Sequence, residues 1–357
     1  MITMSARLTI AVIVSSVALA LSCGGQERAG FSEEDDAGAP APVDDVAPSA
    51  TNDGGAPDAG KRGGGTDAGA SHIETVFVIL MENHSWATIA SAASSATYIN
   101  SELVPMGAHA EQYMTPPGNH PSEPNYIWLE AGDNLGITND AAPSANHRAA
   151  DHLTAQPDEK HVSWKSYAED IAGDLCPLTS TGHFDPKHTP QLYFDDVTDT
   201  NDPTSRRCIE HVRPFTELEG DLTAGNVARF NFITPNLCHD MHGVVGLACP
   251  IVGSDLIKAG DDWLRANVPK ILQSQAYTRN GALFVTWDEG DESLTSAASD
   301  GPIGMIVLSP LARKGYKALT RFDHSSTLRT FERIFDVPFL RGAKDATDLG
   351  EMFTSFP

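Results

Sequence analysis

The sequence is poor in basic residues, and it has neither a closely spaced cysteine pair nor an apolar run of membrane-spanning length. Lysine and arginine together number 24, against 48 aspartates and glutamates in 357 residues. This acidity argues against a nucleic-acid partner and gives no electrostatic attraction toward anionic membranes. Because no CxxC pair occurs, a zinc site built from cysteines is not expected.

Residues 1–22 have the pattern of an export signal. Arg7 precedes the apolar run 8–21, which is too short to cross a hydrocarbon core of about 30 Å comfortably. The ending Leu19-Ala20-Leu21-Ser22-Cys23 resembles a bacterial lipoprotein cleavage box, in which the cysteine is acylated. An ordinary cleaved signal is the alternative. Both interpretations predict an exported protein, either secreted or held on the outer surface or periplasmic face of a bacterial membrane by a lipid anchor.

Residues 24–70 differ in composition from everything that follows. Asp, Gly, Ala and Pro dominate, aromatic residues are nearly absent, and acidic residues outnumber basic ones by ten to three. Such a segment buries too little apolar surface to offset its chain entropy, so we expect a disordered acidic linker. Residues 71–357 are long enough for one large domain.

Four cysteines follow Cys23, and an exported chain favours two disulfides among them. Three pairings are possible, and we expect nearest neighbours to pair, Cys176 with Cys208 and Cys238 with Cys249. Free buried thiols are the alternative.

Four short apolar runs are typical of strands buried on both faces, as central parallel strands are. They are residues 75–80, 229–233, 282–287 and 303–308. Helical spacing predicts helices over 255–273 and 324–335, the second with Ser325 and Ser326 as candidate caps. Strands alternating with helices predict an α/β domain with a doubly wound, mostly parallel sheet flanked by helices.

A polar cluster begins within about seven positions of the end of three of these apolar runs, and each cluster contains candidate site residues. They are Glu82 and Asn83 after the first, Asp240 and His242 after the second, and Asp288 and Glu289 after the third. Because ligands bind beyond the carboxyl ends of parallel strands, we expect these residues to meet in one site.

Glu82, Asn83, Asp288 and Glu289 offer three carboxylates and an amide oxygen. Carboxylates this close repel each other unless a cation neutralises them, and such oxygen ligands favour a hard or borderline divalent ion. Calcium, magnesium, manganese, zinc and iron all remain candidates. For any single pair, the alternative is a turn at a strand end that faces water.

Ser122 follows Asn119-His120-Pro121 and precedes an apolar helical run. The start of a helix favours a phosphate or an alkoxide, so Ser122 is a candidate nucleophile, with a plain helix cap as the alternative. His120, His242 and His324 lie inside polar clusters or at helix starts, where an imidazole can contact phosphate or protonate a leaving group.

The order of these motifs resembles the phosphoesterase family of acid phosphatases and phospholipases C. The matching segments lie within about residues 73–340 and are Phe77-Val78-Ile79-Leu80-Met81-Glu82-Asn83, His120-Pro121-Ser122-Glu123-Pro124-Asn125-Tyr126, Lys187-His188-Thr189-Pro190, Ile233-Thr234-Pro235-Asn236 through Asp240-Met241-His242, Thr286-Trp287-Asp288-Glu289-Gly290 and Asp323-His324-Ser325-Ser326. Within the family, the chain is similar to small secreted acid phosphatases, some of which dephosphorylate phosphoinositides.

The resemblance implies an alkaline-phosphatase-like fold with a bound divalent metal ion. It places the metal on Glu82, Asn83, Asp288 and Glu289, the nucleophile at Ser122, further catalytic groups at His242 and His324, and substrate contacts at His120, Asn125, Asp240 and His188. The implied reaction is hydrolysis of phosphate monoesters through a phosphoserine, with a phosphorylated small molecule or lipid headgroup as the substrate.

Two other functions stay open. A phospholipase C would cleave a phosphodiester, but the chain lacks the C-terminal β-rich region of the larger bacterial phospholipases C, which favours a monoesterase. A surface-anchored binding lipoprotein with an inactive site is the alternative of another class, and the intact carboxylates and Ser122 argue against it. A sulfatase is not expected, because no Cys-x-Pro-x-Arg run occurs.

Overall fold

The computed structural model describes residues 72–156, 160, 162–244, 249, 255–291 and 300–357. The chain divides into two units, residues 1–64 and 65–357, and all described residues belong to the second unit. The expected export signal, the acylated Cys23 and the linker 24–70 lie outside the described residues and stay predictions. Within the described part, no helix has both the length and the apolar character that a membrane crossing requires.

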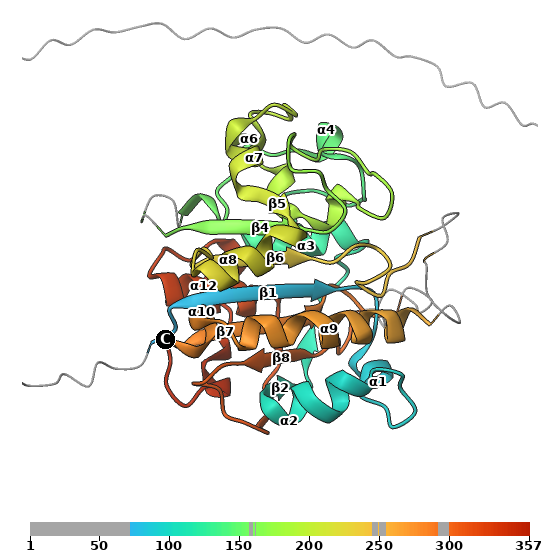
Figure 1. Ribbon diagram of the computed structural model, residues 1–357, viewed down its shortest axis with the longest axis vertical. Helices are drawn as coiled ribbons and strands as arrows, with labels where there is room; N and C mark the ends of the chain where they lie inside the picture. Colours follow the sequence, from blue (N-terminus) through green and yellow to red (C-terminus); the bar gives the residue numbers. More distant parts are fainter. Residues whose placement is uncertain (1–71, 157–159, 161, 245–248, 250–254, 292–299) are drawn as a thin grey trace, which may run out of the picture. The chain divides into compact units, whose positions relative to one another are not determined.

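An eight-stranded sheet in the order β5-β4-β6-β1-β7-β8-β2-β9 organises the domain (Figure 1). The strands are β1 (Thr75–Met81), β2 (Ala108–Ala110), β4 (Trp164–Ala168), β5 (Val212–Pro214), β6 (Phe230–Thr234), β7 (Gly281–Trp287), β8 (Met305–Leu308) and β9 (Lys317–Ala318). All neighbours from β5 to β7 are parallel, and β2 also runs parallel to β9. The predicted mostly parallel sheet is therefore confirmed. Two short strands, β3 (Tyr113–Met114) and β10 (Phe322–Asp323), form a separate parallel pair.

The direction of one predicted strand is wrong. Residues 303–308 contain β8, but it starts at Met305 and runs antiparallel to both β7 and β2. β8 is buried along its whole length, as the parallel strands are. A continuous apolar run indicates that a strand is buried on both faces. Burial does not determine whether the strand runs parallel or antiparallel to its neighbours.

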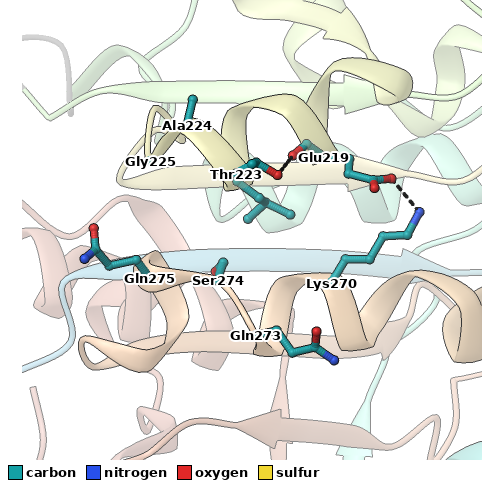
Figure 2. A pocket seen from close by; sticks show the side chains of 9 residues that line it. Glu219, Thr223, Ala224, Gly225, Lys270, Gln273, Ser274 and Gln275 are labelled. Carbon is teal, nitrogen blue, oxygen red and sulfur yellow. Dashed lines mark hydrogen bonds and ion pairs between the residues drawn. The ribbon is translucent and has the colours of Figure 1, made fainter.

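Helices connect and cover the strands. The α-helices are α1 (Trp86–Ile89), α2 (Val104–Met106), α3 (Ser122–Ala131), α4 (Pro143–Asn146), α6 (Asp195–Thr198), α7 (Arg206–His211), α8 (Leu218–Ala224), α9 (Leu256–Leu272), α10 (Gln275–Thr278) and α12 (His324–Phe335). A π-helix, η1 (Ile99–Leu103), and the short 3-10 helices η2 (Pro186–His188), η3 (Pro190–Tyr193), η4 (Phe215–Glu217), η6 (Arg341–Lys344) and η7 (Leu349–Met352) complete the described elements. On the surface, Lys270 of α9 and Glu219 of α8 form an ion pair of 2.8 Å, which Figure 2 shows beside a small pocket.

Both predicted helices form, but the cap of the second one differs. α9 and α12 match the expected ranges closely. Asp323, not Ser325 or Ser326, caps α12: its carboxylate accepts from Ser326 N at 3.0 Å, and Ser326 Oγ accepts from Asp323 N at 3.2 Å. This is a reciprocal capping box. The Asp323 side chain accepts from the backbone N–H of Ser326, and the Ser326 side chain accepts from the backbone N–H of Asp323.

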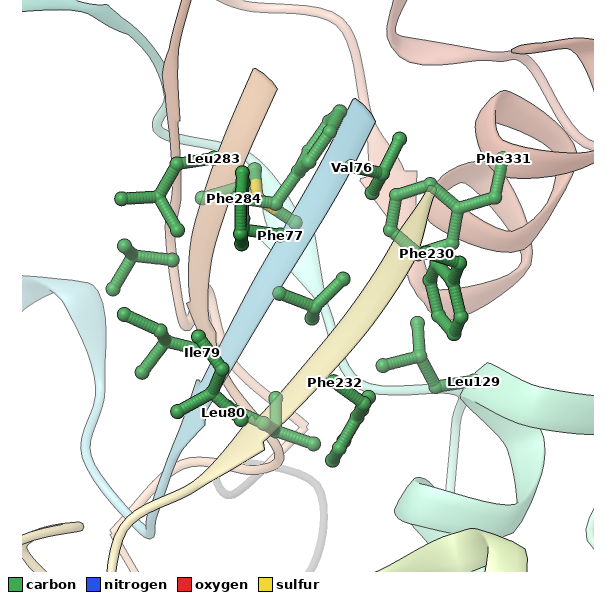
Figure 3. Close-up of a cluster of buried hydrophobic side chains, with 14 of the residues drawn as sticks. Val76, Phe77, Ile79, Leu80, Leu129, Phe230, Phe232, Leu283, Phe284 and Phe331 are labelled. Carbon is green, nitrogen blue, oxygen red and sulfur yellow. The ribbon is translucent and has the colours of Figure 1, made fainter. Parts of the chain in front are cut away.

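The core fills both faces of the central strands β1, β6 and β7 (Figure 3). Phe331 of α12 packs against Phe230 and Phe284, with ring centroids 5.5 and 5.0 Å apart, and Phe230 is the register partner of Val76. Met81 instead lies against Gly260 of α9. Because side chains alternate across a strand, residues 76 and 81 face opposite sides. Helices α12 and α9 therefore cover opposite faces of the sheet, as a doubly wound fold requires.

Both expected disulfides form, Cys176 with Cys208 and Cys238 with Cys249. The second closes a loop across a sequence separation of 11 residues, and its first cysteine, Cys238, lies shortly after the end of β6 at Thr234. It therefore restrains the segment that contains Asp240 and His242.

Replacing each cysteine pair by serines should destabilise the domain to a different degree. Loop-closure entropy predicts a loss of about 3 kcal/mol for Cys238–Cys249 and about 4 kcal/mol for Cys176–Cys208, whose separation is 32 residues. Urea denaturation of the two double variants measures both losses. An unchanged midpoint for either variant would contradict the expectation.

Candidate active site

The carboxyl ends of β1, β6 and β7 lie together because β1 pairs in parallel with both neighbours. Backbone hydrogen bonds continue past the strands: Glu82 N donates to Asp240 O at 2.8 Å, and Asp288 N donates to Met81 O at 3.0 Å. The structure therefore brings together the residues that follow the three strands, as the sequence predicts.

Ser122 is the first residue of α3, and its hydroxyl does not cap that helix. Its Oγ donates to Glu82 Oε2 at 2.8 Å, and both side chains are fully buried. The helix start is instead held by Asp140, whose Oδ1 accepts from Glu123 N at 2.9 Å. Of the two alternatives that the sequence leaves open for Ser122, the structure disfavours the plain cap.

Asn83 and Asp288 are joined by a hydrogen bond, and each has one buried oxygen without a partner among the described residues. Asn83 has a left-handed backbone (φ 48°), which asparagine tolerates better than most residues, and its N–H donates to Asp288 Oδ1 at 3.1 Å. Asn83 Oδ1 and Asp288 Oδ2 have no hydrogen-bond partner among the described residues. A buried oxygen without a donor costs free energy, and carboxylate and amide oxygens are ligands that hard divalent cations prefer. The donor set therefore fits a divalent metal ion.

Glu289, the fourth residue predicted to bind metal, contacts two of the residues predicted to bind substrate. His120 Nδ1 donates to Glu289 Oε2, and Asn125 Nδ2 donates to the same oxygen at 3.3 Å. His120 Nε2 also donates to Asp300 Oδ1 at 2.9 Å. The hydrogen bond with Glu289, reinforced by Asp300, raises the pKa of His120 to about 9 against the opposing effect of burial. His120 is therefore an imidazolium at neutral pH.

Asp240 positions both histidines that lie beside Glu82. Its Oδ2 accepts from His188 Nδ1 at 3.0 Å, and its Oδ1 accepts from His242 N at 2.8 Å. His188 stacks on Tyr126, with ring centroids 4.9 Å apart, and its Nε2 lies 3.3 Å from Glu82 Oε1.

Glu82, His188 and His242 form a second candidate donor set, because one ligand atom from each lies within 4.8 Å of the others. A set with two imidazoles suits zinc or iron, whereas the oxygen set suits calcium, magnesium or manganese. The two sets share Glu82. Sequence reasoning assigned His188 and His242 to substrate and catalysis, and their nearness to Glu82 became apparent only in the folded chain.

The pKa values of two buried carboxyl groups of the site are shifted in opposite directions. Burial raises the pKa of Glu82, but the charges of His188, His242 and Lys187 outweigh it and lower this pKa to about 2. Burial, followed by repulsion from Glu82 and Glu289, raises the pKa of Asp288 well above its usual value. A cation bound beside Asp288 would favour its charged form.

His324 lies beneath Asp288 and is fully buried. Its Nε2 donates to Asp288 O at 2.7 Å, and its Nδ1 accepts from Tyr113 OH at 3.0 Å. Burial lowers the pKa of His324 to about 4, so the ring is neutral. Both nitrogens are engaged, and the ring supports the backbone of Asp288.

Two residues of this site were missed by sequence reasoning. Asp300 pairs with His120, and Tyr113 orients His324. Neither lies in a polar cluster after a strand or beside a recognised motif, so the sequence gives no signal for them.

A mostly parallel sheet with a serine, carboxylates and histidines at its carboxyl edge has counterparts among solved structures. A protein of the alkaline phosphatase superfamily from Vibrio parahaemolyticus shares the fold, with a TM-score of 0.54 and 10% identity over 79% of this chain and 72% of that one. A lipoteichoic acid synthase from Listeria monocytogenes gives a TM-score of 0.51 at 10% identity, covering 78% and 77%.

The family follows from closer relatives. The Phosphoesterase family model matches residues 93–338. The chain is 30% identical over 277 residues to the phosphatidylinositol-3-phosphatase of Mycobacterium tuberculosis, covering 77% of this chain and 82% of that protein. It is 32% identical over 231 residues to the phosphate-repressible acid phosphatase of Penicillium chrysogenum, covering 62% of this chain but only 51% of the fungal protein. The chain belongs to the Phosphoesterase family and is a hydrolase of phosphoric ester bonds.

The stability of the metal-free protein should fall as pH rises from about 6.5 to about 9. Burial lowers the pKa of His188, but Glu82 and Asp240 outweigh it and raise this pKa from 6.5 to about 9. The charged ring stabilises the fold fully below the unfolded-state pKa, and that stabilisation is lost as pH rises through the folded-state value. Urea denaturation across this range should show a shallower decline for His188→Gln than for wild type.

The matched control for this experiment is His147→Gln. His147 also pairs with an aspartate, Asp195, at 2.6 Å, but its side chain is 30% exposed, and water screens such pairs. An identical pH slope in wild type and His188→Gln would contradict the assignment of charge to His188.

Proposed function

We propose that this chain is a metal-dependent phosphomonoesterase, an acid phosphatase in which Ser122 attacks phosphorus and becomes transiently phosphorylated. The observation that carries the proposal is the hydrogen bond of 2.8 Å between the buried Ser122 Oγ and Glu82 Oε2. It places a hydroxyl at the start of a ten-residue helix and against the carboxylate cluster. The free amides and dipole at a helix start favour an anion there.

In the proposed reaction, Ser122 Oγ forms a bond to phosphorus while the bond from phosphorus to the ester oxygen breaks. Glu82 orients the hydroxyl, and with a pKa of about 2 it is a weak base. A divalent ion held by Glu82, Asn83, Asp288 and Glu289 would lower the pKa of the hydroxyl and neutralise charge on the phosphate. Water then hydrolyses the phosphoserine.

The surrounding residues have distinct proposed roles. The imidazolium of His120, anchored on Glu289 and Asp300, attracts the phosphate group through its charge, and Asn125 holds Glu289 beside it. His242, whose Nε2 accepts from Lys187 Nζ and whose backbone is held by Asp240, takes up the proton of Ser122 Oγ and passes it to the leaving oxygen. His188, whose ring nitrogens lie against Asp240 and Glu82, acts on the phosphate through its positive charge. The contacts of His324 suit a positioning role, in which it fixes Asp288.

The substrate class rests on the relatives. The mycobacterial relative is named as a phosphatidylinositol-3-phosphatase, and the fungal relatives are named as acid phosphatases. These names support a phosphorylated small molecule or a phosphoinositide headgroup as the substrate.

Ser122→Ala should lower the turnover of an aryl phosphate by several orders of magnitude, because it removes the nucleophile. Wild-type enzyme that is quenched in acid during turnover should carry phosphate on Ser122, which peptide mass spectrometry can locate. Ser205→Ala is the matched control. Ser205 is also buried and caps a helix, α7, so its loss costs about 1 kcal/mol of stability without affecting turnover.

Two results would contradict the assignment of the nucleophile. One is a folded Ser122→Ala variant that retains more than about a tenth of the wild-type turnover, far above what loss of a nucleophile leaves. The other is trapped phosphate on a different residue, such as Thr115.

A further inference from the structure

Lys187 places a positive charge beside the proposed catalytic residues. Its side chain is only 11% exposed. Its Nζ donates to Asp140 Oδ2 at 2.9 Å and to His242 Nε2 at 3.3 Å. An ammonium has three N–H donors, and the described residues accept from two of them. One donor is therefore available to a ligand next to His242.

The position of this ammonium is fixed by the elements that also fix the nucleophile. Asp140 accepts from Lys187 through one carboxylate oxygen and from Glu123 N, the residue after Ser122, through the other. The backbone of Lys187 is held in η2 by Asp185, whose Oδ1 accepts from Lys187 N at 3.0 Å. Nε2 of the next residue, His188, lies 3.3 Å from Glu82 Oε1. The carboxylate of Asp140 therefore links the side chain of Lys187 to the start of the helix that contains Ser122.

The negative charge of the site determines how Lys187 affects the binding of a phosphate ester. Four buried acidic side chains line the site, namely Glu82, Asp240, Asp288 and Glu289. A phosphate monoester carries a charge of about −1.5 to −2 at pH 7, because its second pKa is about 6, whereas a diester carries a single charge. Each additional negative charge on the substrate is repelled by these carboxylates. A fixed ammonium attracts a dianion more strongly than a monoanion, since the attraction scales with the product of the charges.

We propose that Lys187 is a specificity-determining residue, whose ammonium contacts a non-bridging phosphate oxygen and favours phosphomonoester dianions over phosphodiester monoanions. This inference rests on the phosphatase function proposed above and names its substrate class. A lysine suits the role because its ammonium acts as a point charge that can approach one oxygen while it stays bonded to Asp140.

The test compares two anions that both have non-bridging phosphate oxygens but differ in net charge. Inorganic phosphate, mainly a dianion at pH 8, and dimethyl phosphate, a monoanion, are titrated calorimetrically into the full-length protein. The variants are Lys187→Gln, which keeps an N–H for Asp140 without the charge, Lys187→Met as a second uncharged variant, and Lys187→Arg, which keeps the charge. Lys270→Gln is the control, because it removes a lysine from an ion pair with Glu219 in a pocket that no site residue lines.

Loss of the charge should weaken the binding of inorganic phosphate about tenfold or more, equivalent to about 1.4 kcal/mol, and should change dimethyl phosphate binding much less. Lys187→Arg should retain most of the affinity, and Lys270→Gln should match wild type. The kcat/KM for an aryl phosphate monoester should fall in the uncharged variants mainly through a higher KM, while the diester rate changes little.

Three outcomes would overturn the inference: equal weakening of both anions, no weakening of inorganic phosphate, or a wild-type protein that binds neither. Failure of the proposed function is a separate result. A wild-type protein that binds inorganic phosphate through Lys187 but hydrolyses no aryl phosphate would refute the function and leave the charge discrimination intact.

Discussion

The arrangement of the site follows from one electrostatic constraint, the burial of several carboxylates at the carboxyl ends of three adjacent parallel strands. Glu82, Asp288 and Glu289 are almost fully buried, and like charges in such a place are unfavourable unless cations compensate them. The structure offers two kinds of compensation. Protonated His188 and His120 pair with Glu82 and Glu289, while Asn83 Oδ1 and Asp288 Oδ2 remain available for a metal ion.

A second set of residues, Asp240, His324 and Tyr113, holds the carboxylates and histidines of the site in place. Asp240 fixes His188 through its side chain and the backbone of Glu82 through its carbonyl oxygen. His324 fixes the backbone of Asp288, and Tyr113 in turn fixes the tautomer of His324. These supports come from the segment after β6, from α12 and from β3, so the chemistry depends on distant parts of the chain packing correctly. Such supporting residues keep reactive groups within the narrow range of geometry that catalysis requires.

Much of the fold and part of the site could be predicted from local patterns in the sequence. Continuous apolar runs located β1, β6 and β7, and the polar residues after them meet because parallel strands end at one edge of the sheet. Other features depend on long-range contacts that no local pattern encodes. The antiparallel direction of β8, the pairing of Asp300 with His120 and the bridge from Asp140 to Lys187 belong to this group. The predicted cap of α12 is wrong for a different reason: serine and aspartate cap helices equally well, so the presence of Ser325 and Ser326 did not exclude Asp323.

Metal analysis of the active enzyme tests the central claim most directly. Crystals of turnover-competent protein, with anomalous diffraction recorded at the absorption edges of candidate metals, would show whether an ion lies among these carboxylates. We predict a divalent ion bound by oxygens of Glu82, Asn83, Asp288 and Glu289. Removal of that ion should abolish turnover without unfolding the domain. Full activity in protein that contains no metal, or an ion bound only elsewhere, would contradict the account.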